Sequence, residues 1–174
     1  MNIIILYILV QLFHIYFIST LERSNQIVDL GHDLLPVIPS AYKFVPDLVC
    51  VLLFVVSVYL HRHNYSPLLW SLILLFVLRT IATRLTILPP VKSFECTNRH
   101  PIDCTQDYIF SGHFATTVLC ILFILAARPT WVVSMVLLGL TQAFFIIGLR
   151  SHYTIDVFIG ALVAYFVFSQ QQSK

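Results

Sequence analysis

The chain has 174 residues and a formal net charge of +2; 59% of its residues are hydrophobic and only 10% are charged. Since a soluble domain carries about a quarter charged residues, this composition excludes a soluble domain and predicts an integral membrane protein. The small charge, with no basic cluster, argues against a nucleic-acid partner. We expect a single membrane domain over residues 1–174.

Six apolar runs approach the roughly 20 residues that a helix needs to cross the hydrocarbon core. They cover residues 3–19, 45–60, 68–88, 109–127, 131–149 and 155–168. Because lipid does not tolerate exposed irregular backbone, the runs predict an all-α polytopic bundle of six transmembrane helices. The first run lacks a preceding basic segment and a following cleavage site, so we expect a retained helix rather than a signal peptide.

The polar residues separate to one side of this predicted bundle. Alternating crossings put residues 20–44, 89–108 and 150–154 on one side of the membrane, which we call the polar side. All eight acidic residues belong to it: Glu22, Asp29, Asp33, Asp47, Glu95, Asp103, Asp107 and Asp156. Lys and Arg are also more numerous there, which by the positive-inside rule would make that side cytosolic. An anion site gathers cations for its own reasons, so the count leaves the orientation open.

The segment at 151–156 (SHYTID) stands directly before the last apolar run. His152 and Asp156 are four residues apart, a spacing that puts both on one face of a helix. The carboxylate would then accept a hydrogen bond from one imidazole nitrogen and leave the other as a base or nucleophile. The alternative is that Asp156 serves as an ordinary ion-pair partner or helix cap.

A second polar segment, residues 107–113 (DYIFSGH), precedes the fourth run. Ser111 is suited to cap a helix and Gly112 to allow close approach, so the free N–H groups of this helix would bind an anion. His113 would lie beside that anion, and Asp107 is a candidate contact for a polar headgroup. The alternative for His113 is an ordinary histidine at the membrane interface.

Arg79 lies well inside the third run, where an arginine costs about 2.5–3.5 kcal/mol on insertion scales. A phosphate-binding role would explain that cost, and an ion pair with a structural acid such as Asp47 is the alternative. His32 and Asp33 fit a solvated loop better than a site.

Four cysteines are present. Cys50 and Cys120 lie in apolar runs and are expected in the core. Cys96 and Cys104 share a polar loop, where a disulfide and two free thiols are equally open. Two histidines and one aspartate would suffice for zinc, but no HExxH or CxxC pattern accompanies them, so a metal site is disfavoured.

Four segments resemble the sphingomyelin synthase family, within the wider lipid phosphate phosphatase superfamily. They are residues 45–47 (VPD), 78–89, 104–113 and 152–157 (HYTIDV), so that the resemblance spans about residues 45–168. The third segment has one residue more than the family's Cys-Gly-Asp pattern before Asp107, and Phe114 stands where the family often has Thr. These departures leave the headgroup and the acceptor open.

The resemblance implies a phospholipid headgroup phosphotransferase. His152, oriented by Asp156, would attack the phosphorus, and His113 would protonate the departing diacylglycerol. Arg79, Asp107, Ser111 and Gly112 would bind the substrate. A lipid alcohol such as ceramide would then take the phosphocholine or phosphoethanolamine from the phosphohistidine, without a metal or other cofactor.

For location, the resemblance implies a multi-pass protein of the Golgi, the endoplasmic reticulum or the plasma membrane. It also implies a lumenal or exoplasmic site with cytosolic termini, against the Lys and Arg count. Two other functions remain as alternatives: a lipid phosphatase or phospholipase C that uses water at the same site, and a non-enzymatic bundle. The oligomeric state is open, a homo-oligomer included.

Overall fold

The computed structural model describes residues 3–18, 29–86 and 109–172, and all regular structure in these ranges is helical. The long helices are α1 (Ile3–Ile18), α3 (Phe44–Leu60), α4 (Ser66–Leu85), α5 (Gly112–Ala127), α6 (Val132–Gly148) and α7 (Thr154–Gln172). A short helix, α2 (Leu30–Leu34), and two 3-10 turns, Ser40–Tyr42 and Pro129–Trp131, lie between them. The all-α prediction is thus confirmed for the described residues.

The predicted count of six membrane spans is not confirmed. Within the described ranges, four helical stretches are long and apolar enough to cross a membrane: Ser40–Leu60, Ser66–Leu85, Pro129–Gly148 and Thr154–Gln172. α1 and α5 have 16 residues each, and at 1.5 Å per residue each extends about 24 Å, short of the roughly 30 Å of hydrocarbon. α5 starts at Gly112 because the Ser111 hydroxyl accepts the Phe114 N–H at 3.2 Å and so caps the helix.

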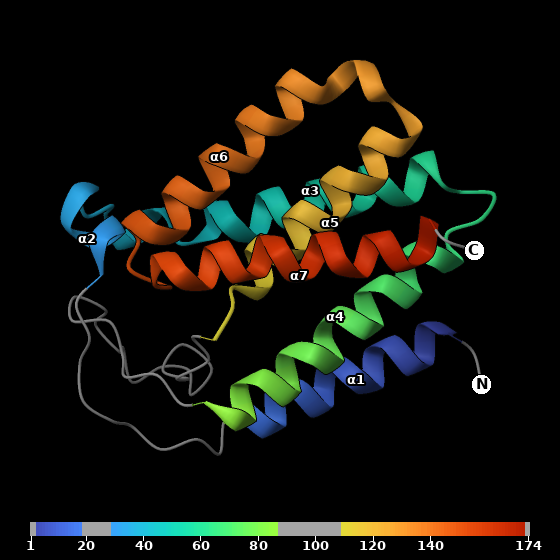
Figure 1. Cartoon of the computed structure of the whole chain (residues 1–174), viewed down its shortest axis with the longest axis horizontal. Coiled ribbons are helices and arrows are strands. Elements are labelled where there is room, and N and C mark those ends of the chain that lie inside the picture. Colours follow the sequence, from blue (N-terminus) through green and yellow to red (C-terminus); the bar gives the residue numbers. More distant parts are fainter. Residues whose placement is uncertain (1–2, 19–28, 87–108, 173–174) are drawn as a thin grey trace.

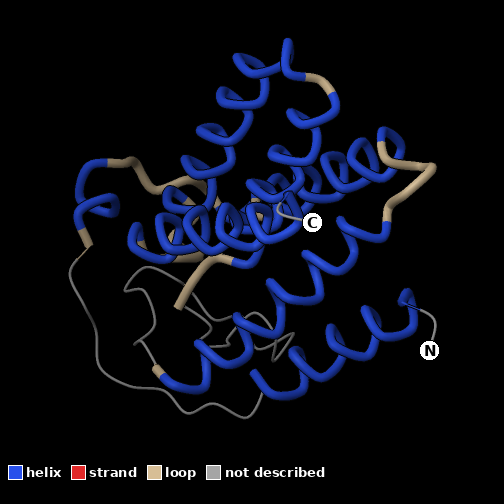
Figure 2. Tube along the Cα trace, turned by 45° about the vertical axis from the view of Figure 1, so that its right-hand side comes forward, coloured by secondary structure: helices blue, strands red, loops and turns tan. Residues whose placement is uncertain are grey.

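The long helices run in alternate directions, as Figure 1 shows. Both termini lie on the right of that view, together with the α3–α4 and α5–α6 connections, which Figure 2 draws as short loops. α2 and the first turns of α3 and α7 lie at the opposite end. The four described acidic residues belong to these elements or cap them: Asp29, the N-cap of α2, and Asp33, Asp47 and Asp156. The predicted segregation of acidic residues therefore holds for these four. Glu22, Glu95, Asp103 and Asp107 lie outside the described residues.

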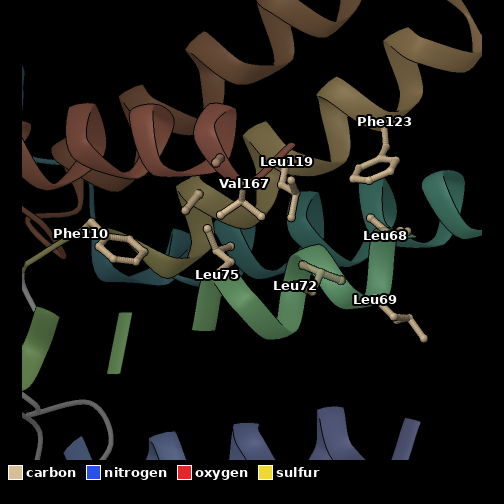
Figure 3. Close-up of a cluster of buried hydrophobic side chains, with 10 residues drawn as sticks. Leu68, Leu69, Leu72, Leu75, Phe110, Leu119, Phe123 and Val167 are labelled. Carbon is tan, nitrogen blue, oxygen red and sulfur yellow. The ribbon is translucent and has the colours of Figure 1, made fainter. Parts of the chain in front are cut away.

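α5 is the central helix of the bundle. It packs against α3, α4, α6 and α7. Leucines of α4 meet α5 and α7 in one apolar core (Figure 3), which consists of Leu68, Leu69, Leu72, Leu75, Phe110, Ala115, Leu119, Phe123, Ala164 and Val167. A smaller cluster of Phe114, Ile146, Ile147 and Val157 joins α5, α6 and α7. Phe114 follows His113 directly, so this cluster fixes the first turn of α5.

α3 and α6 expose large apolar side chains along their outer faces. Val51, Val55, Val133, Leu137 and Leu140 are each more than half exposed. A water-soluble protein rarely leaves contiguous apolar surface of this kind uncovered, so these faces fit contact with lipid. Together with the apolar helices, they fit a membrane protein.

We predict that Leu119→Ala lowers the free energy of unfolding by about 2 kcal/mol, because the side chain is fully buried at the centre of α5 and its removal leaves a cavity. The stability is lost because van der Waals contacts disappear, and not because apolar surface meets water, since lipid tails are as apolar as leucine. Leu140→Ala is the matched control: Leu140 lies on α6 and is 63% exposed, so its removal should change stability by less than about 0.5 kcal/mol. Reversible unfolding in mixed micelles measures both, and equal effects would contradict the central place of α5.

Candidate active site

His152 and Asp156 come together at the start of α7, although not in the predicted way. α7 begins at Thr154, so His152 lies two residues ahead of the helix and shares no helical face with Asp156. The Asp156 carboxylate turns back instead: its Oδ2 accepts the Tyr153 N–H at 2.9 Å and lies 3.6 Å from His152 Nδ1. The pair is therefore formed by a capping contact, and the prediction of an i, i+4 pair within the helix is wrong.

This arrangement gives the two imidazole nitrogens of His152 different surroundings. Nδ1 faces a carboxylate that is fully buried, and His152 itself is only 7% exposed. At 3.6 Å the contact is longer than a hydrogen bond. Nε2 is the ring nitrogen that this contact does not use.

Arg79 packs against the start of α5. A methyl group at position 112 would lie 2.5 Å from the Arg79 Cζ, so a glycine is needed there for the guanidinium to reach the helix N-terminus. Arg79 is 9% exposed. A buried arginine at a helix N-terminus makes a site suited to an anion such as phosphate. One turn further along α4, the Thr83 hydroxyl donates to the Arg79 carbonyl at 2.7 Å.

His113 pairs with Asp47, a partner that the sequence interpretation did not propose. His113 Nε2 lies 2.7 Å from Asp47 Oδ1, and the two side chains are 47% and 65% exposed. Asp47 was considered as an ion-pair partner for Arg79, and the structure gives its carboxylate to His113 instead. The signal in the sequence was the VPD segment at 45–47; its contact with a residue 66 positions away could not be read from spacing.

The two polar segments meet through the main chain. The Ser111 N–H donates to the Asp156 carbonyl at 3.1 Å. The close approach depends on Gly160, since a Cβ there would lie 3.2 Å from the Ser111 carbonyl. Ser111, Gly112, Arg79 and Asp156 thus form one contiguous group. Asp107, the remaining predicted site residue, lies outside the described residues, as do Cys96 and Cys104.

His32 was interpreted as part of a solvated loop, and this is wrong. Its Nε2 lies 2.9 Å from the His152 carbonyl oxygen, and its ring packs against Tyr153 with 5.5 Å between centroids. Asp29, at the N-cap of α2, accepts hydrogen bonds from the Thr154 N–H and hydroxyl. Burial alone would raise the pKa of Asp29, but the hydrogen bonds from Thr154 and His32 outweigh it and hold this pKa below its usual value. Asp33 is exposed, as predicted.

Arg150 adopts a left-handed backbone conformation with φ of 58°. For a residue other than glycine this costs on the order of 1–3 kcal/mol, so surrounding contacts must hold it. Its guanidinium is buried and donates to the His32 carbonyl at 2.6 Å and to the Leu35 carbonyl at 2.9 Å. This arginine is committed to the backbone of the α2 segment rather than to a phosphate.

Cys50 is half-buried in α3 and Cys120 is buried in α5, both as free thiols, in line with the core positions predicted for them. Among residues 3–18, 29–86 and 109–172, no three His, Cys, Asp or Glu side chains gather closely enough to hold a metal ion.

Comparison with known families adds one match. Residues 103–173, less than half of the chain, match the family model described as PAP2 superfamily C-terminal. The match supports the lipid phosphate phosphatase superfamily. The matched stretch contains Ser111, Gly112, His113, His152 and Asp156, whereas Asp47 and Arg79 lie before it. The similarity suggests an enzyme of the lipid phosphatase or phosphotransferase type, and it does not single out the sphingomyelin synthase family. No curated protein matches the chain at a significant level.

We predict that Gly112→Ala displaces the Arg79 guanidinium, because the new methyl group would occupy its position. Overpacking of a buried site costs roughly 1–3 kcal/mol, so the free energy of unfolding should fall. Gly139→Ala is the matched control in α6, where the added methyl meets Ile121 at an ordinary 3.4 Å and a helical glycine is replaced by a better helix former. Unfolding in micelles measures both variants; a Gly112→Ala protein as stable as Gly139→Ala would contradict the contact between Arg79 and Gly112.

Proposed function

We propose that the chain is a phospholipid headgroup phosphotransferase that acts through a phosphohistidine on His152. The observation that carries this proposal is the pairing of His152 Nδ1 with the buried Asp156 carboxylate, directly beside a helix N-terminus that Arg79 contacts. A nucleophile with an orienting carboxylate, next to an anion site, is the arrangement that phosphoryl transfer needs.

The first step would be attack of His152 Nε2 on the phosphorus of a glycerophospholipid. The N–P bond forms as the P–O bond to diacylglycerol breaks, and His113 gives a proton to the departing oxygen. Arg79 and the N–H groups at the start of α5, with Ser111 and Gly112, would hold the phosphate oxygens as charge builds up on them. Asp107 would contact the headgroup.

The second step would return His152 to its starting state. A lipid hydroxyl such as that of ceramide gives its proton to His113 and attacks the phosphorus, and the N–P bond breaks. The product would carry phosphocholine or phosphoethanolamine. Since Asp47 Oδ1 contacts Nε2 of His113, the other nitrogen of that ring, Nδ1, would exchange the proton in both steps.

A hydrolase is the alternative function, and the match to the PAP2 superfamily model supports it as a second candidate. A lipid phosphate phosphatase or phospholipase C would use the same residues, with water in place of the lipid alcohol. The two reactions differ only in the group that reaches the phosphohistidine.

The deciding assay uses purified protein in EDTA with fluorescent ceramide and phosphatidylcholine or phosphatidylethanolamine. We expect label on a phosphorylated ceramide product, and a loss of about 10³-fold or more in His152→Ala. His63→Ala, in the α3–α4 connection at the opposite end of the bundle, is the matched histidine control and should retain the rate. Diacylglycerol with free headgroup and no transfer would assign the hydrolase; no turnover with any headgroup would reject both enzymes.

We predict that Asp47→Asn lowers kcat about tenfold, because the carboxylate bound to His113 Nε2 supports the protonated ring during proton transfer. The same substitution made in a His113→Ala background should add little, since the partner through which Asp47 acts is gone. Rates of the four proteins in this cycle measure the coupling. Two independent, multiplying losses would mean that Asp47 does not act through His113.

A further inference from the structure

The segment that contains α2 lies against the connection between α6 and α7, at the left of Figure 1. Contacts between the two run from one end of the connection to the other. At its start, the Ile38 N–H donates to the Gly148 carbonyl at 2.8 Å. At its end, Asp29 and Gly31 bond to Thr154. His152 lies between these two points of attachment.

Three hydrogen bonds join Thr154 to the α2 segment. Asp29 Oδ2 accepts the Thr154 N–H at 2.9 Å, and Asp29 Oδ1 accepts its hydroxyl hydrogen at 2.6 Å. The same hydroxyl oxygen accepts the Gly31 N–H at 3.1 Å. A Cβ at Gly31 would overlap the hydroxyl, so the contact is close enough to require a glycine.

His152 and Arg150 are held from the same segment. His32 Nε2 lies 2.9 Å from the His152 carbonyl oxygen; since a carbonyl can only accept, this nitrogen carries the hydrogen. The Arg150 guanidinium donates to the carbonyls of His32 and Leu35. These contacts hold the left-handed backbone at Arg150.

We propose that Asp29, His32 and Arg150 form a clamp that positions His152 for phosphoryl transfer. The clamp matters because His152 lies two residues before the start of α7, so contacts of the connection, rather than the helix, set its position. Its contact with Asp156 depends on the conformation of residues 150–154, and the three clamp residues fix the backbone at Arg150, His152 and Thr154. This inference rests on the proposed function, since it assigns these residues to the nucleophile of that reaction.

The test removes, in the whole chain, the Thr154 hydroxyl that Asp29 of the clamp binds. Thr154→Val is nearly isosteric and loses the bonds to Asp29 Oδ1 and Gly31, whereas Thr154→Ser restores the hydroxyl. Thr141→Val is the matched control: Thr141 lies on α6, and its hydroxyl bonds only locally, to the Leu137 carbonyl at 2.9 Å. Each protein is assayed for kcat and KM, and the ¹⁵N signals of the His152 ring are recorded in micelles, with His152→Ala for assignment.

For Thr154→Val we expect kcat to fall roughly 10- to 100-fold, the effect of a small misplacement of a reacting group, with KM within about twofold. The His152 signals should change from one tautomer, with hydrogen on Nδ1 facing Asp156, to a mixture. Thr154→Ser should return both readouts towards the wild type, and Thr141→Val should leave both alone. If Thr154→Val does not fold, His32→Leu, with His32→Gln as the variant that restores a donor, is read by the same criteria.

Two results would overturn the clamp: an unchanged kcat in Thr154→Val, or a lower kcat with unchanged His152 signals, which would place the effect elsewhere. Failure of the proposed function is a separate result. If the wild-type protein turns over no lipid, the ring signals still decide the clamp, because they report the position of His152 without any substrate.

Discussion

One residue in the first turn of α7, Asp156, touches both polar segments of the candidate site. Its side chain caps the Tyr153 N–H and faces His152, while its carbonyl accepts the Ser111 N–H at the start of α5. The side chain is fully buried, and a carboxylate in that position is costly unless polar groups surround it. The structure meets this requirement by bringing the N-terminal ends of two helices together, so the site and the packing of α5 on α7 depend on the same contacts.

The need of buried polar groups for hydrogen-bond partners also explains why a segment remote in sequence enters the site. The connection between α6 and α7 is short and carries a buried arginine in a left-handed conformation. Buried main-chain groups need partners, and residues 29–38 supply them: the carboxylate of Asp29, the ring of His32 and the carbonyls of His32 and Leu35. Local helix geometry alone would leave the backbone around His152 without these bonds.

The sequence predicted the helices well and their ends less well. Apolar runs mark membrane helices strongly, so each long helix was anticipated, but α5 starts at the Ser111 cap and not at Ile109. The four-residue spacing correctly predicted that His152 and Asp156 lie close together. The predicted geometry, with both residues on one helical face, is wrong. The contacts of His113 with Asp47 and of His32 with His152 were missed. They join residues 66 and 120 positions apart, and no periodicity or local motif in one sequence records such pairs.

The two histidines differ in burial, and this bears on how the proposed reaction would proceed. His152 and Asp156 are enclosed by protein, whereas the side chains of His113 and Asp47 are 47% and 65% exposed. A nucleophile gains from a fixed, dry position, because desolvation strengthens its contact with the orienting carboxylate. An acid–base group that must serve a departing lipid and then an arriving one needs access from outside. In the proposed mechanism both lipids would therefore approach His113 from the side of α3, and the choice between a lipid alcohol and water as acceptor would be made there rather than at His152.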